Sequence, residues 1–399
     1  MNPEIPQYNE EELKLDAAAN FNRPYRQCAV SVMDTIADPG IKFDEEGVSN
    51  YYHEYKLAER SLVFSGDAGK EKLKEAIGKI KLAGKDNKYD CILGLSGGAD
   101  SSYLALLAKR NGLRPLVVHF DYGWNLELAV QNIENIVRKL EFDLYTVVMD
   151  WEEMKSLQRS YYRASVLDLD VPADHMIFGA LYQTAAKFNI KYILSGKNTV
   201  TEATLPIAWN YNKFDLVNLK SIHKQFENTS LKKLPRLGIW QFGKYTAVNR
   251  IEIIELLDFV DYNKEEVKRT LAEELNWKDY GGKHYENIFT RLYQSYVLPV
   301  KFGIDKRKAH LSNLIFSGQL TKDEALKELS KLPYDEKIVV EDIEYVSKKL
   351  GFSVPEFIEL IKQPSRLHAE FGTDDFHKKL YKLSFKLARP LIKAWKKIK

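Results

Sequence analysis

Apolar runs and amphipathic stretches alternate through the middle of the chain. Short apolar runs predict strands over 90–95, 114–121, 143–149 and 192–195. Amphipathic spacing predicts helices over 69–84, 101–111, 125–140 and 174–188. Because strands that alternate with helices favour a parallel sheet with right-handed crossovers, we expect an α/β fold.

The carboxyl ends of parallel strands meet at one edge of a sheet, and ligands bind there. Four segments follow the predicted strands at that edge: 96–102, 119–125, 150–151 and 196–202. We therefore expect these segments to surround the functional site.

The two flanks of the chain have a different pattern. Residues 1–60 show little periodicity and contain turn signals at 38–40 and 45–47, which indicates a small irregular or β-hairpin module. After about residue 250 helices are predicted, over 251–257, 264–274, 285–297, 322–331, 340–350 and 355–362. The last segment, 375–399, carries an apolar stripe surrounded by lysines. We expect three parts: a small module over 1–60, an α/β domain over 61–250 and a helical substrate-binding or interaction domain over 251–399.

Segment 96–102 reads SGGADSS and joins a predicted strand to a predicted helix. Its glycines let the backbone approach an anion closely, and the helix start favours negative charge. Asp100 would repel a phosphate unless a cation lies between them, so we interpret it as a Mg²⁺ ligand. The segment therefore predicts a phosphate-binding loop.

This loop lacks the Lys-Ser/Thr pair of a Walker A motif. It resembles instead the PP-loop of the ATP pyrophosphatase superfamily, whose members cleave ATP between the α- and β-phosphates and transfer AMP. The resemblance implies a Rossmann-like (HUP-type) domain that binds ATP. The ATP-binding residues carried over are Leu95, Ser96, Gly97, Gly98, Asp100, Ser101, Ser102, His119, Asp121 and Gly196.

Composition argues against several classes of protein. The net charge of +3 argues against a general nucleic-acid binder. Two cysteines exclude a disulfide scaffold and suit a reducing cytosol. The first residues lack the pattern of a secretory leader and no run is long enough to span a bilayer, so we expect a cytoplasmic protein.

Four further segments, taken together, point to a narrower family. They read HFDYGWN (119–125), ILSGKN (193–198), WKDYGGKH (277–284) and FGIDKRKAHLS (302–312). The combination resembles the N-acetyl sugar amidotransferase family of bacterial surface-polysaccharide (lipopolysaccharide O-antigen) biosynthesis. The resemblance implies that a sugar acetamido group on a nucleotide-linked N-acetyl sugar becomes an acetamidino group at the expense of ATP. It also implies Mg²⁺ and ammonia from a separate glutaminase with a cyclase-like barrel partner.

The chain departs from this family near its N-terminus, where members commonly carry four cysteines resembling a zinc site. The matching positions here are 28–31 and 48–52, and only Cys28 is a cysteine. One thiolate, two serines and a tyrosine cannot form a tetrahedral zinc site, so we expect no zinc.

Amide-to-amidine conversion needs the amide oxygen to be activated, ammonia to be oriented and a proton to be removed. Asp100, Lys197 and Glu202 are the catalytic candidates: Asp100 through Mg²⁺, Lys197 at the α-phosphate or imidate and Glu202 as proton acceptor. Structural alternatives remain open: Lys197 as a solvated loop lysine and His119 as a core histidine. Candidate sugar-binding residues are Asn198, Lys283, His284, Arg291, Lys306 and Arg307, with a salt-bridged helical surface as the alternative for the basic ones.

The positions of the cysteines indicate whether this chain could release ammonia from glutamine itself. Position 2 is Asn, Cys91 lies in a predicted buried strand and Cys28 has no histidine nearby in sequence. A glutaminase needs a thiolate nucleophile, so we expect ammonia to come from another protein.

Other functions stay open. One alternative is a PP-loop enzyme that adenylates tRNA, and another is a non-catalytic nucleotide-binding partner protein. The basic terminal helix would lie against the inner face of the membrane, or dock on the helical domain or on another subunit of a homo-oligomer.

Overall fold

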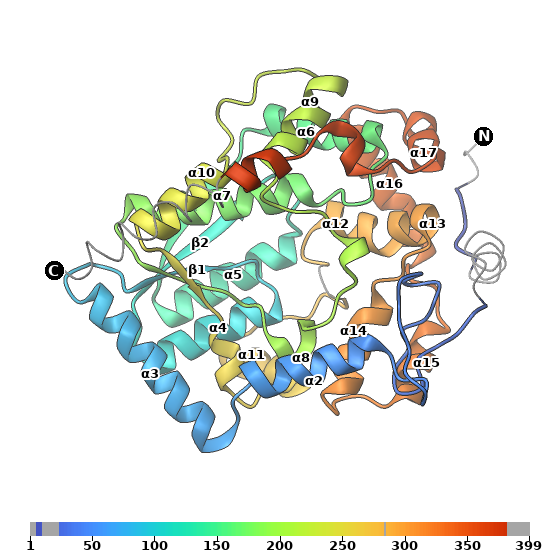
Figure 1. The fold of residues 1–399 in the computed structure, drawn as a ribbon. Coiled ribbons are helices and arrows are strands. Elements are labelled where there is room, and N and C mark those ends of the chain that lie inside the picture. The colour runs from blue at the N-terminus through green and yellow to red at the C-terminus, as the bar shows by residue number, and fades with distance from the viewer. Residues whose placement is uncertain (1–4, 10–23, 283–284, 381–399) are drawn as a thin grey trace.

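The computed structural model describes residues 5–9, 24–282 and 285–380. A parallel five-stranded sheet forms its centre, in the order β3-β2-β1-β4-β5 (Figure 1). The strands are β1 (Cys91–Gly94), β2 (Pro115–Asp121), β3 (Asp143–Val148), β4 (Tyr192–Leu194) and β5 (Glu252–Ile254). The α/β fold and the four predicted strands are confirmed.

Strand β5 corrects one prediction, because a helix was expected over 251–257. Ile253 pairs instead with Ile193 of β4, and Leu256–Phe259 forms a 3₁₀ turn. An apolar run this short has no distinguishable period, so its place at the sheet edge decides its conformation.

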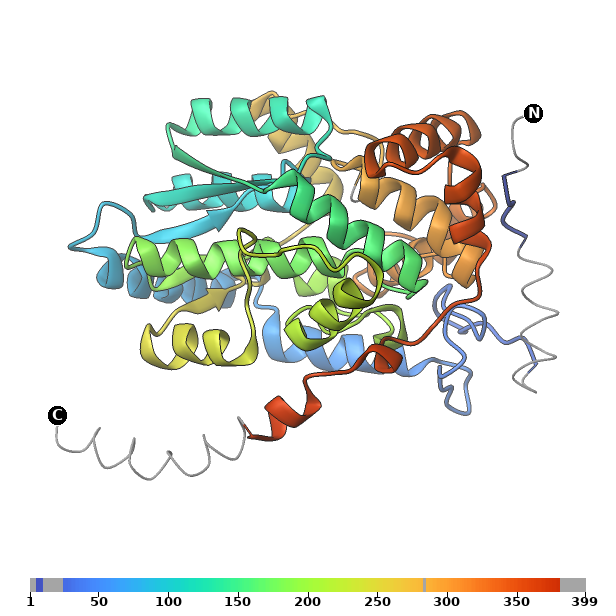
Figure 2. The same ribbon diagram turned by 90° about the horizontal axis from the view of Figure 1, so that it is seen from above.

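Helices cover both faces of the sheet (Figure 2). Cys91 and Leu93 of β1 face a core formed with α3 (Gly66–Gly84), α4 (Ala99–Arg110), α5 (Glu127–Leu140) and α11 (Lys264–Leu275). Ile92 faces the other core, with α7 (Val171–Lys187) and α10 (Ile239–Gly243). Strand residues point alternately to the two faces, so a strand buried on both faces reads as a continuous apolar run.

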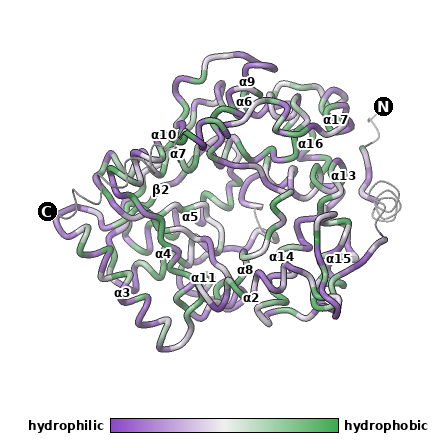
Figure 3. The backbone as a smooth tube through the Cα atoms, in the orientation of Figure 1, coloured by the Kyte–Doolittle hydropathy of each residue, from purple (hydrophilic) through white to green (hydrophobic). Residues whose placement is uncertain are grey.

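A third, larger core lies beside the sheet and is built mainly from helices on the right of Figure 1. Hydrophobic and hydrophilic positions alternate along many of these helices (Figure 3), as expected where one face is buried. The helices of this core are α2 (Asn50–Leu62), α6 (Trp151–Ala164), α9 (Leu216–Phe226), α12 (Ile288–Leu292), α13 (Leu298–Phe302), α14 (Arg307–Phe316), α16 (Glu336–Leu350) and α17 (Val354–Lys362). The shorter helices α8 (Thr199–Glu202) and α15 (Lys322–Leu329) pack beside α14. The sequence pattern missed α2, α6, α9 and α14, and also the short helices α8, α10 and α13. The division into three domains stays a prediction.

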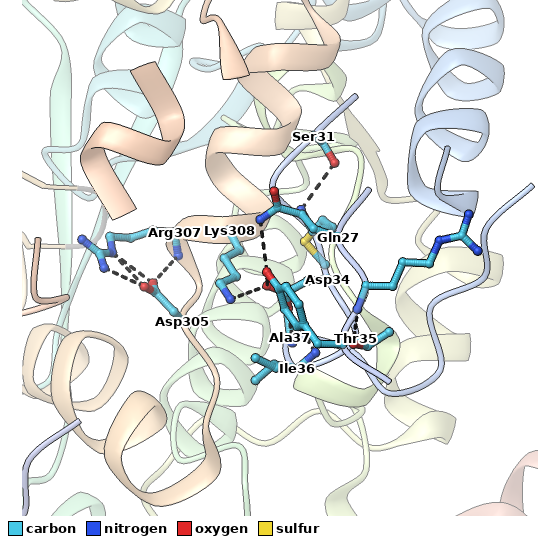
Figure 4. Close-up of polar contacts among 12 residues, drawn as sticks. Gln27, Ser31, Asp34, Thr35, Ile36, Ala37, Asp305, Arg307 and Lys308 are labelled. Carbon is cyan, nitrogen blue, oxygen red and sulfur yellow. Dashed lines mark hydrogen bonds and ion pairs between the residues drawn. The ribbon is translucent and has the colours of Figure 1, made fainter. Parts of the chain in front are cut away.

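The N-terminal module is irregular only up to residue 49, where α2 begins. Its centre is Asp34, which is fully buried and accepts a 2.6 Å hydrogen bond from the equally buried ammonium of Lys308 (Figure 4). The backbone N–H groups of Ile36 and Ala37 also donate to Asp34. A buried ion pair and packing therefore hold this module to α14. Helical residues begin again at Asp375, and the rest of the predicted basic helix, 381–399, lies outside the described residues.

Candidate active site

The loop between β1 and α4 has the geometry of an anion cradle. Gly97 has φ +87°, and a β-carbon there would lie 2.8 Å from the Ala129 carbonyl oxygen, so only glycine fits. Gly98 caps α4 without any side-chain hydrogen bond. The N–H groups of the first helical turn have no intrahelical acceptor and remain for a ligand.

The three serines of this loop have different positions. Ser96 and Ser101 lie with their hydroxyl oxygens 3.2 Å apart, and both line a cavity. Ser102 is buried, and its hydroxyl donates a 2.6 Å hydrogen bond to the Gly98 carbonyl. The prediction that Ser102 contacts ATP is therefore not supported: it fixes the turn from inside.

An aromatic segment after α11 braces the loop. The buried Trp277 donates its indole N–H to the Gly97 carbonyl at 2.8 Å. The Tyr280 hydroxyl approaches Gly98, since a β-carbon there would lie 3.4 Å from it. Asn132 of α5 holds the segment by two hydrogen bonds to the Lys278 backbone. Only the tertiary fold gives these residues a role, although the sequence motif contained them.

Asp100, the predicted Mg²⁺ ligand, lies in the first turn of α4 and accepts a hydrogen bond from the Tyr262 hydroxyl. Tyr262 is buried, and burial together with the charge of Asp100 raises its pKa well above the usual range. The phenol is therefore a fixed donor that orients the carboxylate. Sequence reasoning missed Tyr262, which lies in the predicted helical region.

Two cavities meet at the loop and share Ser96, Gly196 and Glu286. One, of about 440 Å³, runs along the sheet edge toward α7 and the C-terminal helices. The other, of about 650 Å³, lies over the start of α4 and reaches α8 and α11. A β-carbon on Gly196 would come within 3.1 Å of the Ser101 backbone nitrogen, so the absent side chain lets the β4 loop approach α4.

The smaller cavity is largely apolar near the sheet. Leu95, Val118, Phe178 and Leu181 line it. His119 also lines it and is buried, donating from Nδ1 to the Leu95 carbonyl at 3.2 Å and accepting at Nε2 from Asn125. Burial lowers the pKa of His119, so the ring is neutral and fixed. His119 is therefore a core residue that also forms part of the cavity wall. Its position is compatible with both predicted alternatives, a core histidine and an ATP-binding residue.

The larger cavity is strongly charged. Six carboxylates and three lysines line it: Asp100, Glu202, Glu265, Asp279, Glu286, Glu328, Lys197, Lys264 and Lys268. A polyphosphate in such a place needs a divalent cation, and Mg²⁺ is held by few carboxylates together with phosphate oxygens. The donor set therefore fits Mg²⁺ bound with a nucleotide, and Asp100 lies in the same first turn of α4 as the N–H groups without an intrahelical acceptor. No group of three or more His, Cys, Asp or Glu residues suited to a metal is found within the described ranges.

Lys197 and Glu202 both line this larger cavity, as expected for residues that follow β4. The Lys197 ammonium is more than half exposed and lies 3.4 Å from Glu255, so it is available to a ligand. Asn198 is buried and caps α8, accepting from the backbone and hydroxyl of Thr201. Its side-chain oxygen thus supports the loop that carries Glu202, and the binding of the sugar by Asn198 stays a prediction.

Most of the predicted sugar-binding residues have structural partners. Arg291 forms a bidentate ion pair with Asp342 at 2.7 and 2.8 Å, which joins α12 to α16. Arg307 forms one with Asp305 and also donates to carbonyls at the end of α15, such as Lys331 (Figure 4 shows the Asp305 pair). These ion pairs favour the structural alternative, a salt-bridged helical surface, and substrate binding by the two arginines stays a prediction. Lys283 and His284 lie outside the described residues, whereas Lys306 lines the smaller cavity.

Of the four predicted rim segments, three border the two cavities. Asp150 instead caps α6 and pairs with Lys233. Asp121 also lies outside the cavity walls, because its carboxylate accepts from the Gly123 backbone in the turn after β2.

The two cysteines are both buried. Burial raises the pKa of Cys91 far above the usual range. At Cys28 burial also raises the pKa, but hydrogen bonds from Ser31 and Ser49 outweigh it and lower the pKa overall.

Comparisons with known proteins match both halves of the site. Residues 90–176 match the family described as queuosine biosynthesis protein QueC, and residues 286–385 match the LPS biosynthesis protein WbpG-like, C-terminal domain. The first match contains the loop and β1–β3; the second contains the helices that wall the smaller cavity. The fold and loop thus define an ATP-using enzyme class, the PP-loop ATP pyrophosphatases. Residues 90–176 of the chain thus carry the PP-loop match, and residues 286–385 are similar to a WbpG-like lipopolysaccharide-biosynthesis domain.

Individual relatives are more distant. The uncharacterized protein MJ1599 of Methanocaldococcus jannaschii is 25% identical over 274 residues, covering 65% of this chain and 80% of that protein. The tRNA-specific 2-thiouridylase MnmA 2 of Fusobacterium nucleatum is 25% identical over 327 residues, covering 73% and 88%. Among solved structures, the NH3-dependent NAD synthetase of Campylobacter jejuni is 13% identical with a TM-score of 0.32, covering 71% and 97%. No helix of the described chain is long and apolar enough to cross a membrane.

Proposed function

We propose that this protein converts the acetamido group of a nucleotide-linked N-acetyl sugar into an acetamidino group, using ATP and ammonia. One observation carries the proposal: the uncapped start of α4 opens onto two cavities that meet at Ser96, Gly196 and Glu286, and the WbpG-like helices wall one of them. A single ATP could then lie with its adenosine in the apolar cavity and its pyrophosphate over the loop. The sugar amide would reach the α-phosphate where the cavities meet.

The reaction has two steps. The amide oxygen attacks the α-phosphorus and pyrophosphate leaves, giving an O-adenylated imidate. Ammonia then attacks the imidate carbon, the bond to AMP oxygen breaks and AMP leaves. No protein nucleophile is needed, so the protein contributes position and charge.

These contributions to position and charge can each be assigned to residues of the described chain. The N–H groups at the start of α4, with Ser96 and Ser101, would hold the pyrophosphate portion. Mg²⁺ at Asp100 would neutralise the charge of the phosphates. Lys197 would stabilise the charge at the α-phosphate, and Glu202 would accept a proton as ammonia adds. Both cysteines of the chain are buried, so neither is exposed as a nucleophile for glutamine. The proposal therefore includes a separate glutaminase with a cyclase-like barrel as the source of ammonia.

A direct assay tests the reaction. Purified protein is incubated with ATP, Mg²⁺, an ammonium salt and a panel of nucleotide-linked N-acetyl sugars whose amide oxygen is isotopically labelled. AMP that carries the label, together with a sugar in which NH replaces the amide oxygen, is the expected result. ADP in place of AMP, or AMP without label, would contradict the proposal.

The similarity to a tRNA-specific 2-thiouridylase keeps a second candidate in view, adenylation of tRNA. The same assay with tRNA in place of the sugar separates the two. AMP release that depends on tRNA would favour the second candidate. ATP binding without AMP release under any condition would favour a non-catalytic partner protein. The contacts of the terminal basic segment with a membrane or another subunit also remain proposals.

A further inference from the structure

The two cavities beside the phosphate-binding loop meet at Ser96, Gly196 and Glu286. Glu286 is the charged member of these three, and its side chain is partly buried. The reaction proposed above brings the sugar amide to the α-phosphate at this junction. A carboxylate in this place must therefore either stabilise something that arrives there or weaken the binding of the nucleotide.

A short backbone pairing fixes the position of Glu286. Asn125 and Asn287 form an antiparallel bridge. Beside the bridge, the Leu126 N–H donates a 2.9 Å hydrogen bond to the Glu286 carbonyl oxygen. The pairing joins the segment after β2 to the WbpG-like match, which begins at Glu286. The residue is therefore held at the point where the two matched parts of the chain meet.

The Glu286 carboxylate lies near the glycine turn of the loop. A β-carbon on Gly98 would lie 3.7 Å from Oε1 of Glu286 and 3.4 Å from the hydroxyl oxygen of Tyr280. The Tyr280 hydroxyl is buried and has no hydrogen-bond partner in the described part of the chain. Because a buried donor without an acceptor is unfavourable, a phosphate oxygen over Gly98 would satisfy it. That phosphate would lie beside the Glu286 carboxylate.

A carboxylate beside a phosphate repels it unless a positive charge is near both. The proposed Mg²⁺ ligand Asp100 lines only the larger cavity, whereas Glu286 lines both. The proposed reaction brings a second positive charge to the junction. When the amide oxygen bonds to the α-phosphorus, the nitrogen lone pair forms a C=N bond. The adenylated amide then carries a positive charge on its N–H group until ammonia adds.

We propose that Glu286 is a catalytic residue of the adenylation step: its carboxylate accepts a hydrogen bond from the acetamido N–H and stabilises the positive charge that develops there. This inference rests on the proposed function and adds to it, because it restricts the acceptor to amides that carry an N–H. The proton stays on the nitrogen, pyrophosphate leaves, and ammonia later displaces AMP. Glu202, which lines only the larger cavity, keeps the separate role of proton acceptor. A charge that is already in place stabilises a transition state without rearrangement.

ATP binding tests the inference without a sugar. Glu286→Gln keeps the size of the side chain and removes the charge beside the phosphates, so ATP with Mg²⁺ should bind the full chain about threefold more tightly in a calorimetric titration. Glu341→Gln, at an exposed position of α16 that lines neither cavity, is the matched control and should bind ATP as the wild type does. Weaker binding by Glu286→Gln would show that the carboxylate holds Mg²⁺ or the local structure. Unchanged binding would show that no phosphate lies beside it, and either result would overturn the inference.

Isotope exchange tests the adenylation step itself. With ammonia omitted, labelled pyrophosphate should enter ATP in the presence of the nucleotide sugar that supports AMP formation in the assay above. Glu286→Gln should slow this exchange by about 100-fold, while the KM for ammonium of the remaining activity stays at the wild-type value. Unchanged exchange with a raised KM for ammonium would show that Glu286 binds ammonium instead, and would overturn the inference.

The two kinds of failure are distinguishable. If the wild type forms no AMP with any sugar, the proposed function fails and the inference fails with it. If the wild type is active, the inference stands or falls on the comparison of Glu286→Gln with the wild type and with Glu341→Gln.

Discussion

The indole N–H of Trp277 donates a 2.8 Å hydrogen bond to the carbonyl oxygen of Gly97, across 180 positions of sequence. Gly97 has a positive φ and sits at the sharpest point of the phosphate-binding loop. The loop is therefore shaped partly by a residue that follows α11, outside the strand-loop-helix unit. Preorganised donors act strongly on charge because they need no rearrangement, so this brace matters for nucleotide binding.

Trp277→Phe tests the brace. The ring still packs, but the buried Gly97 carbonyl loses its donor, so the free energy of unfolding should fall by about 1–3 kcal/mol. Affinity for ATP should fall as well, because the loop is less fixed. Urea unfolding and nucleotide titration measure the two effects. Trp240→Phe, on the half-exposed face of α10, is the matched control and should leave ATP affinity unchanged. Unaltered stability and affinity in Trp277→Phe would contradict the role of this bond.

Asp100 and Tyr262 form a second testable pair. Asp100→Asn keeps the size of the side chain but removes its charge, so pyrophosphate release should be lost while the thermal midpoint stays near that of the wild type. Tyr262→Phe keeps the charge and removes the orienting donor, so kcat should fall by about tenfold. Both are measured by pyrophosphate release with varied Mg²⁺. Full activity of Asp100→Asn would show that the metal ligand lies elsewhere.

The Asp34–Lys308 pair should be a major stabilising contact of the N-terminal module. Lys308→Met leaves a buried carboxylate without its cation and should cost about 3–5 kcal/mol of unfolding free energy. The double variant Asp34→Asn/Lys308→Met should be less destabilised, because the amide oxygen still accepts from Ile36 and Ala37. Lys331→Met removes an exposed pair with Glu328 and should cost about 1 kcal/mol or less. Urea unfolding compares all three; equal losses would contradict the argument.

Metal chelation should leave the module intact. With Cys28 as the only thiolate there, a tetrahedral zinc site cannot form, and the Asp34–Lys308 pair holds the module. The thermal midpoint should therefore be the same with and without a strong chelator. Stoichiometric zinc in the purified protein, or a midpoint lowered by chelation, would contradict this.

Stability should fall at mildly acidic pH because of buried histidines. Burial lowers the pKa of His175 to about 4, and the neutral ring donates from Nδ1 to the Lys213 carbonyl and accepts from the Leu237 N–H. The unfolded chain takes up the proton near pH 6.5, so the stability is complete above that value and is lost as the pH falls toward 4. Between about pH 7 and 5 this histidine should cost about 2 kcal/mol. His175→Gln should reduce the slope in urea unfolding; an unchanged slope would contradict it.

Local features of the sequence were enough to predict the centre of the fold. The first four strands, helices α4, α5 and α7 between them and the loop at 96–102 were predicted from the sequence. Burial on both faces gives a strand a continuous apolar run, and glycine marks the turn from a strand to a helix. Strand β5 was not predicted, since three residues carry no period. Helices α2 and α6 were missed as well, although each buries residues in the largest core.

The candidate site also contains residues that the sequence was enough to place and residues that needed the structure. Four predicted site residues line the cavities because they lie near or after the carboxyl ends of parallel strands, which meet at one edge of the sheet. They are Asp100, Lys197, Glu202 and His119. The partner of Arg291, Asp342 of α16, was supplied only by the tertiary structure, whereas Arg307 and Asn198 contact Asp305 and Thr201 of their own segments. Sequence spacing fixes which side chains leave one element together, but a charge finds its counter-charge through contacts between elements. For the same reason the place of Lys306 in the wall of the smaller cavity could be recognised only once the C-terminal helices had been placed beside α7.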